Sequence, residues 1–323
     1  MSRASSGPFA APARDGHPRR RFAQHFLHDQ AVIRRIIDAV APGPDDLIVE
    51  VGPGRGALTF PMLASGCELH AIEIDRDLAA RLRSQTPHHP NLTVHEADAL
   101  DFDLDRIAPP PRRFRVIGNL PYNISTPLLF RFLASLPRIT DMHLMLQKEV
   151  VERMASVPGT REYGRLSVMV QLDCEVERVI RAGPGAFHPA PRVESAVVRL
   201  RPRPHIALDH ARRRRLEAIV RACFSKRRKT LRNALRGICD ERLIAAAGLD
   251  PRVRPEILSV GDFIDLARAS VDRGDANVRI GGRQLSTKSV ENSVDKSPSS
   301  RVCTDIQGNR NRLAKKSPGH GII

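Results

Sequence analysis

The chain has no tryptophan, two tyrosines and only five cysteines among its 323 residues. The cysteines are Cys67, Cys174, Cys223, Cys239 and Cys303, and no two of them form a C-x-x-C pair. This odd, scattered set predicts neither a disulfide framework nor a zinc or other metal site, and it favours a reducing, cytoplasmic environment. No apolar run approaches the roughly 20 residues that cross a bilayer, so we expect no membrane partner.

Acidic residues are in the minority, because 36 Asp and Glu stand against 52 Lys and Arg. The formal net charge is +16 and the sequence pI is near 10.8. Such a field attracts polyanions, of which nucleic acid is the commonest partner of proteins. Charge alone does not distinguish RNA from DNA or from anionic lipid.

The first part of the chain divides into an arm and an α/β region. Residues 1–20 are rich in Pro, Ala, Ser and Arg, and we predict a disordered basic arm there in preference to a transit peptide. Residues 21–204 alternate short apolar runs with helical periods, as in a doubly wound sheet with crossover helices. The expected strands are 47–51, 69–74, 92–95, 114–117, 142–146, 174–180 and 195–200, with a helix at 126–136 among those between them.

Beyond residue 204 the pattern changes to amphipathic helices. We expect a small all-helical domain over residues 205–275, with helices at 212–224, 227–235, 241–247 and 260–271. Residues 276–323 contain no aromatic residue and an excess of Ser, Gly, Asn, Lys and Arg. They are predicted to form a disordered basic tail.

A glycine-rich turn follows the first long strand, with Gly52, Gly54 and Gly56 after Glu50. Glycines at this place let the backbone approach a ligand closely, and Glu73 at the end of the next strand can accept hydrogen bonds from both ribose hydroxyls of a nucleoside. The spacing indicates a nucleoside cofactor without naming its chemistry. An NAD-binding Rossmann domain and a tight turn with no ligand both remain open on this motif alone.

Two further strand ends carry polar groups. Asp98 follows the third strand, where its carboxylate can accept from an adenine amino group, although an isolated Asp at such a place is more often a helix N-cap. The fourth strand ends in the segment from Asn119 to Tyr122, which has the sequence NLPY. An Asn oxygen and the carbonyl before a rigid proline can both accept from the exocyclic amino group of adenine, and Tyr122 offers a face for the extruded base.

The motifs together resemble the KsgA family of bacterial small-subunit ribosomal RNA adenine-N6 dimethyltransferases, which is related to the Erm resistance enzymes and the eukaryotic Dim1 proteins. The likeness runs over residues 21–269. It is carried by QHFL at 24–27, VEVGPG at 49–54, EIDRDLAARL at 73–82, GNLPYNISTP at 118–127, MLQKEV at 145–150, YGRLSV at 163–168 and FHPAPRVES at 187–195.

The resemblance implies a class I methyltransferase fold, Rossmann-like, with a helical C-terminal domain. It implies that S-adenosylmethionine is held by His25, Leu27, Gly52, Gly54, Glu73, Asp98 and Asn119. It implies a catalytic group made of Asn119, Leu120, Pro121, Tyr122 and Phe187. In that group Phe187 would pack on the target adenine opposite Tyr122, whereas its sequence context alone indicates a core residue.

Basic runs at 212–215 and 226–229 lie in the expected helical domain, where we expect them to meet phosphates, with a solvated helical face as the alternative. The second run also resembles the family, so we predict that Arg227, Arg228 and Lys229 contact RNA phosphates. The expected partner is 16S ribosomal RNA within the assembling small subunit, and the expected product is dimethylation of two adjacent adenosines in its 3′-terminal hairpin.

Three other functions compete with this interpretation. They are an Erm-like methylation of large-subunit RNA, a ribosome-assembly factor for which methylation is dispensable, and an NAD-dependent dehydrogenase. The last leaves the NLPY segment unexplained and lacks a recognisable catalytic His or Tyr-Lys arrangement. With no heptad pattern or apolar interface patch in the sequence, we expect a monomer.

Overall fold

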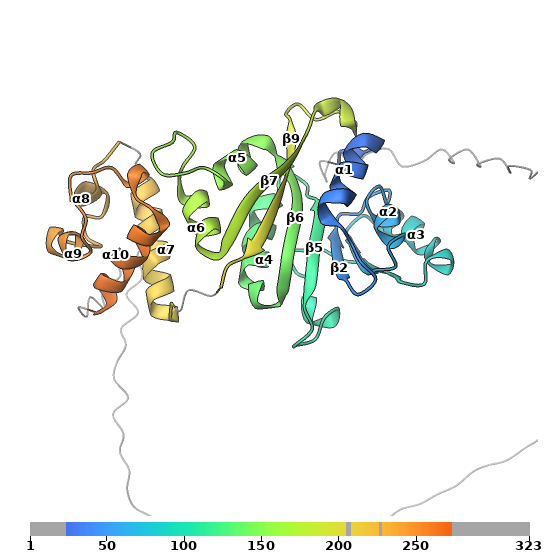
Figure 1. Ribbon diagram of the computed structural model, residues 1–323, viewed down its shortest axis with the longest axis horizontal. Coiled ribbons are helices and arrows are strands. Elements are labelled where there is room, and N and C mark those ends of the chain that lie inside the picture. Colours follow the sequence, from blue (N-terminus) through green and yellow to red (C-terminus); the bar gives the residue numbers. More distant parts are fainter. Residues whose placement is uncertain (1–23, 205–207, 226–227, 273–323) are drawn as a thin grey trace, which may run out of the picture. The chain divides into compact units, whose positions relative to one another are not determined.

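The computed structural model describes residues 24–204, 208–225 and 228–272 (Figure 1). The predicted arm at 1–20 and tail at 276–323 lie outside the described residues. The described part contains one large mixed sheet, one small two-stranded sheet and a helical C-terminal region.

The large sheet has seven strands in the spatial order β4-β3-β2-β5-β6-β9-β7. Their bounds are β2 Leu47–Val51, β3 Glu68–Glu73, β4 Leu92–Glu96, β5 Phe114–Asn119, β6 Ile139–Gln147, β7 Cys174–Ala182 and β9 Ser195–Pro202. Strands β2 to β6 run parallel to one another, and β9 runs antiparallel between β6 and β7. All seven strands lie where the sequence predicted them.

Helices cover both faces of this sheet because its strands are apolar on both sides. In β2, Ile48 belongs to one core cluster and Val49 to the other, as expected for side chains that alternate along a strand. The cluster of Val49 includes side chains of α4 (Ser125–Ala134), α5 (Lys148–Met154) and α6 (Arg165–Asp173). The cluster of Ile48 includes side chains of α1 (Gln30–Val40) and α2 (Thr59–Leu63). Helix α3 (Arg76–Arg83) connects β3 to β4.

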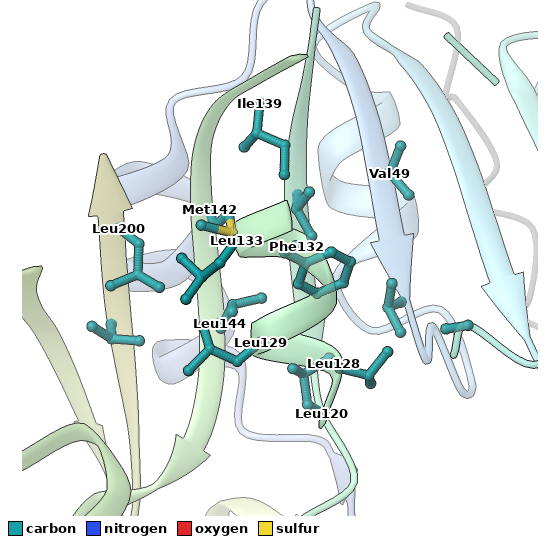
Figure 2. Close-up of a cluster of buried hydrophobic side chains, with 14 of the residues drawn as sticks. Val49, Leu120, Leu128, Leu129, Phe132, Leu133, Ile139, Met142, Leu144 and Leu200 are labelled. Carbon is teal, nitrogen blue, oxygen red and sulfur yellow. The ribbon is translucent and has the colours of Figure 1, made fainter. Parts of the chain in front are cut away.

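Helix α4 is the element that joins the core to the end of β5. Figure 2 shows its apolar side chains Leu128, Leu129, Phe132 and Leu133 packed over the sheet. All four are at most 7% exposed. The helix ends at Ala134, two residues earlier than predicted, because Ser135 to Arg138 turn into a short 3-10 segment that contains Pro137.

The described C-terminal region contains only helices: α7 (His210–Ser225), α8 (Leu231–Ala234), α9 (Glu241–Ala246) and α10 (Val260–Asp272). Their buried side chains form a third core cluster, which also takes in Tyr163 and side chains of α6. The predicted helix at 227–235 is wrong in its first part. Arg228 and Lys229 lie in a turn, and α8 begins only after Thr230, whose backbone is extended.

One pairing was not predicted. Strands β1 (Phe26–Leu27) and β8 (Phe187–His188) form a two-stranded antiparallel sheet in which Leu27 faces Phe187. It ties the start of the described chain to a segment about 160 residues away. It therefore fixes the QHFL segment beside the carboxyl ends of β2 and β5, where the strand order reverses and open α/β sheets bind ligands.

Candidate functional site

A single cavity lies at the carboxyl ends of β2, β3, β4 and β5. It is lined by every residue predicted for cofactor binding and for catalysis except Phe187. These lining residues are His25, Leu27, Gly52, Gly54, Glu73, Asp98, Asn119, Leu120, Pro121 and Tyr122. Parallel strands bring their ends to one edge, so polar groups dispersed over about 100 residues of sequence meet there.

The glycine turn after β2 requires glycine at more than one position. Gly52 and Gly54 have φ of 68° and 58°, in the left-handed region that side chains disfavour. A Cβ on Gly54 would come within 3.1 Å of the Phe26 ring, whereas one on Gly52 would meet only the Asn119 carbonyl at 3.6 Å. The turn thus keeps a bare backbone on the cavity side.

Glu73 anchors this turn through its carboxylate. One oxygen accepts a hydrogen bond from Gly54 N–H at 3.1 Å and the other from Asp75 N–H at 2.9 Å. The side chain is 4% exposed, and burial raises its pKa, while these two hydrogen bonds act in the opposite direction. Each carboxylate oxygen can accept a second hydrogen bond, so the group remains able to receive hydroxyl donors.

Asp98 makes a local turn contact and lines the cavity, and no helix begins directly after it. One oxygen accepts from the backbone N–H of Leu100 at 2.8 Å, which is the local capping contact of a turn. The other oxygen makes no hydrogen bond within the described part of the chain, and the residue lines the cavity. An acceptor is therefore available to a ligand.

Asn119 has a side chain whose orientation is set by a distant segment. Its Nδ2 donates to the carbonyl of His25 at 3.0 Å. A carbonyl only accepts, so the amide nitrogen must face His25, and Oδ1 is left as the acceptor that remains for a ligand. The next residue, Leu120, is fixed by donating its N–H to Met145 O at 3.1 Å and is 1% exposed.

Tyr122 is held at both ends. Its hydroxyl is 2.7 Å from Ser195 Oγ on β9, and its ring lies 5.8 Å from the His25 ring at an interplanar angle of 30°. Burial raises the pKa of the phenol. The His25 ring is itself placed by a 2.7 Å hydrogen bond between Nδ1 and Pro189 O. The aromatic face of Tyr122 is thereby fixed at the cavity wall.

Phe187 lies apart from the other predicted catalytic residues. It is 3% exposed, belongs to the core cluster on the α1 side of the sheet, and pairs with Leu27 through the small sheet. It does not line the cavity. Its contact with a target base stays a prediction.

Two residues at the site were missed by the sequence reasoning. Glu50 is 2% exposed beneath the glycine turn, accepts from Thr59 Oγ1 at 2.6 Å and has its pKa raised to about 7, mainly by burial. A carboxyl group inside the apolar strand LIVEV was the signal that could have found it. Ser195, which is fully buried, has no comparable signal because its role comes from packing against Tyr122.

The predicted RNA-contacting residues lie elsewhere. Arg228 and Lys229 are exposed in the turn before α8, and Arg227 lies outside the described residues. Within residues 24–204, 208–225 and 228–272, no cluster of three or more His, Cys, Asp or Glu side chains is arranged to hold a metal ion. No helix in these ranges is long and apolar enough to span a membrane.

This fold and cavity define a class I methyltransferase: a doubly wound sheet with a helical C-terminal part and a glycine turn, an acid and the NLPY segment at successive strand ends. A family model described as ribosomal RNA adenine dimethylase matches residues 17–270. The chain belongs to this family. The dehydrogenase interpretation of the glycine turn is therefore wrong.

Individual relatives agree with the family. A ribosomal RNA small subunit methyltransferase A of Pseudomonas syringae pv. tomato is 51% identical over 252 residues, which are 77% of this chain and 93% of that relative. The solved dimethyladenosine transferase of Plasmodium falciparum is 26% identical with a TM-score of 0.67, covering 77% of this chain and 98% of its own. The 23S rRNA methyltransferase ErmE is 28% identical with a TM-score of 0.61, covering 76% and 99%.

Proposed function

We propose that this protein uses S-adenosylmethionine to dimethylate the N6 atoms of two adjacent adenosines in the 3′-terminal hairpin of small-subunit (16S) ribosomal RNA. The observation that carries the proposal is the Asn119 amide, whose oxygen is turned toward the cavity by the His25 carbonyl. The 51% identity to a small-subunit methyltransferase, against 28% to ErmE, favours the small subunit over the large one.

The cavity suits S-adenosylmethionine, which supplies a methyl group on a positively charged sulfur. Glu73 would accept the ribose hydroxyls, and the second oxygen of Asp98 would accept the adenine amino group. The bare backbone at Gly52 and Gly54 permits close approach of the ligand. His25 and Leu27 would close the cavity from the side of the small sheet.

The NLPY segment would hold the target adenine. The lone pair of N6 is delocalised into the ring, so the nitrogen becomes a better nucleophile when acceptors draw its N–H groups out of the ring plane. Asn119 Oδ1 and the carbonyl of Leu120, held in place before Pro121, would accept those N–H groups. The proton then leaves after transfer, and no strong base is needed. Tyr122 would stack on the base.

Phe187 stays in this proposal as a packing residue on the opposite side of the target base. Since its ring is 3% exposed, we expect the contact to require a shift of β8 when RNA binds. An RNA-free and an RNA-bound form should therefore differ around the small sheet.

Residues 21–204 would then act as the methyltransferase domain and residues 205–275 as a helical RNA-binding domain. Arg227, Arg228 and Lys229 would neutralise phosphates of 16S rRNA in the assembling small subunit. We propose that the protein works as a monomer in the cytoplasm and contributes to small-subunit biogenesis.

The first experiment measures transfer of labelled methyl groups to unmethylated small subunits, large subunits and naked RNA, followed by nucleoside analysis. We expect N6,N6-dimethyladenosine on small subunits alone. Label on large-subunit RNA would instead support Erm-like activity. Tight binding to small subunits without any labelled methyl group would instead support a role as a ribosome-assembly factor.

Asn119→Ala tests the role proposed for the Asn119 amide oxygen. We expect transfer to fall by at least about 10²-fold, because an acceptor that positions the nucleophile is lost, while small subunits are still bound. The matched control is Asn123→Ala, an exposed amide in the same loop that does not line the cavity. Equal activities of the two variants would overturn the assigned role of Asn119.

A further inference from the structure

A second cleft lies beside the first cavity, between the sheet domain and the helices that follow it. Its walls include Thr126 and Phe130 of α4, Arg153 of α5, Arg165 at the start of α6 and Phe224 of α7. These helices can be followed in Figure 1. The cleft is therefore built by three successive helices of the α/β region and the first helix of the C-terminal region.

Two phenylalanine rings form its apolar walls, and both are only partly buried. Phe130 packs against the core beneath α4 and also against the core of the C-terminal helices. Phe224 is braced by Tyr163 at 6.0 Å and by Phe263 at 5.8 Å between ring centroids. Rings held in this way can stack on a planar group at little entropic cost.

Two arginines supply positive charge at the same place. Arg153 and Arg165 are exposed, and their guanidinium groups make no hydrogen bond or ion pair within the described part of the chain. Other arginines nearby are neutralised, for example Arg213, whose guanidinium pairs with Asp173 at 2.6 Å. Two unpaired guanidinium groups beside aromatic faces are suited to a phosphate and a base.

The cleft is connected to the target site along α4. Ser125, the first residue of that helix, donates from its Oγ to the Tyr122 carbonyl at 3.1 Å, and Thr126 is the next residue. Thr126 and Phe130 lie on one helix face, one turn or ~6 Å apart. An RNA strand that runs from the ring of Tyr122 along α4 would therefore reach the cleft.

We propose that this cleft binds a nucleotide of the RNA strand next to the target adenosine, with its base between Phe130 and Phe224 and its phosphate on Arg153 and Arg165. The proposal rests on the function proposed above. The neighbour of the target is thereby held while the target adenine contacts Asn119 and Tyr122.

The test compares two double variants that remove the same charge. Arg153→Gln with Arg165→Gln should raise KM for unmethylated small subunits about tenfold at physiological salt and leave kcat and cofactor affinity unchanged. The slope of log affinity against log salt should fall by about 1.5. The control, Arg34→Gln with Arg35→Gln, alters two exposed arginines of α1, which packs on the opposite face of the sheet.

A second measurement identifies the occupant. A benzophenone-bearing residue in place of Thr126 is irradiated in the complex with unmethylated small subunits, and the cross-linked nucleotide is mapped by reverse transcription. We expect a stop within one or two nucleotides of the methylated adenosines. A cross-link to a ribosomal protein, or to a distant nucleotide, would overturn the proposal.

The two proposals fail differently. Without dimethyladenosine from the wild-type protein, the proposed function is lost. If the wild-type protein transfers methyl groups normally but the cleft variant and the α1 control have the same KM, only the proposal for the cleft is contradicted.

Discussion

Two buried carboxyl groups lie beneath the glycine turn, and at the scale of single residues they are the main electrostatic cost of the site. Glu50 and Glu73 are 2% and 4% exposed. Burial raises the pKa of both carboxyl groups, and the nearby charge of Glu73 raises the pKa of Glu50 further. A ligand that donates hydroxyl groups to Glu73 would offset part of that cost. The cofactor proposed for this site would therefore stabilise it.

Glu50 should make stability depend on pH. Its pKa rises from 4.5 to about 7 on folding, so the folded state keeps a proton that the unfolded chain releases between these values. The free energy of unfolding therefore falls as pH rises through this window, by about 3 kcal/mol from this group. Glu50→Gln keeps an acceptor for Thr59 but does not titrate. Its free energy of unfolding should therefore rise relative to wild type by about 2–3 kcal/mol as the pH goes from 5 to 8.

Urea unfolding of both proteins at several pH values measures this difference. Thr59→Val serves as the companion variant, because it removes the donor at 2.6 Å and should destabilise the fold most at pH 8, where the carboxylate is charged. If wild type and Glu50→Gln differ in unfolding free energy by the same amount at pH 5 and pH 8, the raised pKa of Glu50 is contradicted.

At the scale of elements, the catalytic loop is placed by the close approach of β5 to β2. A Cβ on Gly118 would lie 2.5 Å from the Val51 carbonyl and 2.9 Å from Leu120 Cδ2. Only glycine allows the strands to meet at this spacing, immediately before Asn119. Helix α4 then fixes the other end of the loop by burying its apolar face in the core (Figure 2).

Gly118→Ala should therefore lower both stability and activity. We expect a loss of about 1–3 kcal/mol in the free energy of unfolding, because the strands must separate, and a large loss of methyl transfer, because Asn119 moves with them. Denaturant unfolding and the transfer assay check the two effects. Gly183→Ala is the control, since Gly183 has φ of −72° and no atom within 4 Å of a built Cβ. Equal stability of both variants would refute the packing argument.

At the scale of the whole molecule, the sheet region and the C-terminal helices share contacts in a common core. Tyr163 donates from its hydroxyl to Leu258 O at 2.9 Å, and Asp173 at the end of α6 pairs with Arg213 of α7. Tyr163 also packs within the cluster of the C-terminal helices. The two regions are therefore linked by buried polar and apolar contacts as well as by the chain.

The protein should be monomeric. The large apolar side chains that are exposed within the described ranges are only Ile74, Val157, Val193 and Ile257, which is too little apolar surface for a stable dimer. We expect light scattering in high salt, which removes bound nucleic acid, to give 35.8 kDa from low to high micromolar concentration. A mass near twice that value, independent of salt, would be inconsistent with this prediction.

The α/β pattern, the seven strands of the large sheet and the polar groups at four strand ends were all predictable from the sequence. These features are local: a strand is an apolar run of a few residues, and Gly52, Glu73, Asp98 and Asn119 each lie at the end of such a run or within two residues of it. Because parallel strands present their carboxyl ends at one edge, the order of these runs was enough to predict that the groups meet.

Which distant segments contact those groups depends on how the chain packs, and no local pattern predicted it. His25 orients Asn119 across 94 residues, and Ser195 holds Tyr122 across 73. The pairing of β1 with β8 buries Phe187 beside Leu27 instead of exposing it in the cavity. Two-residue strands and single hydroxyl contacts leave no periodic signal in the sequence, since they form only when the packed sheet brings their partners together.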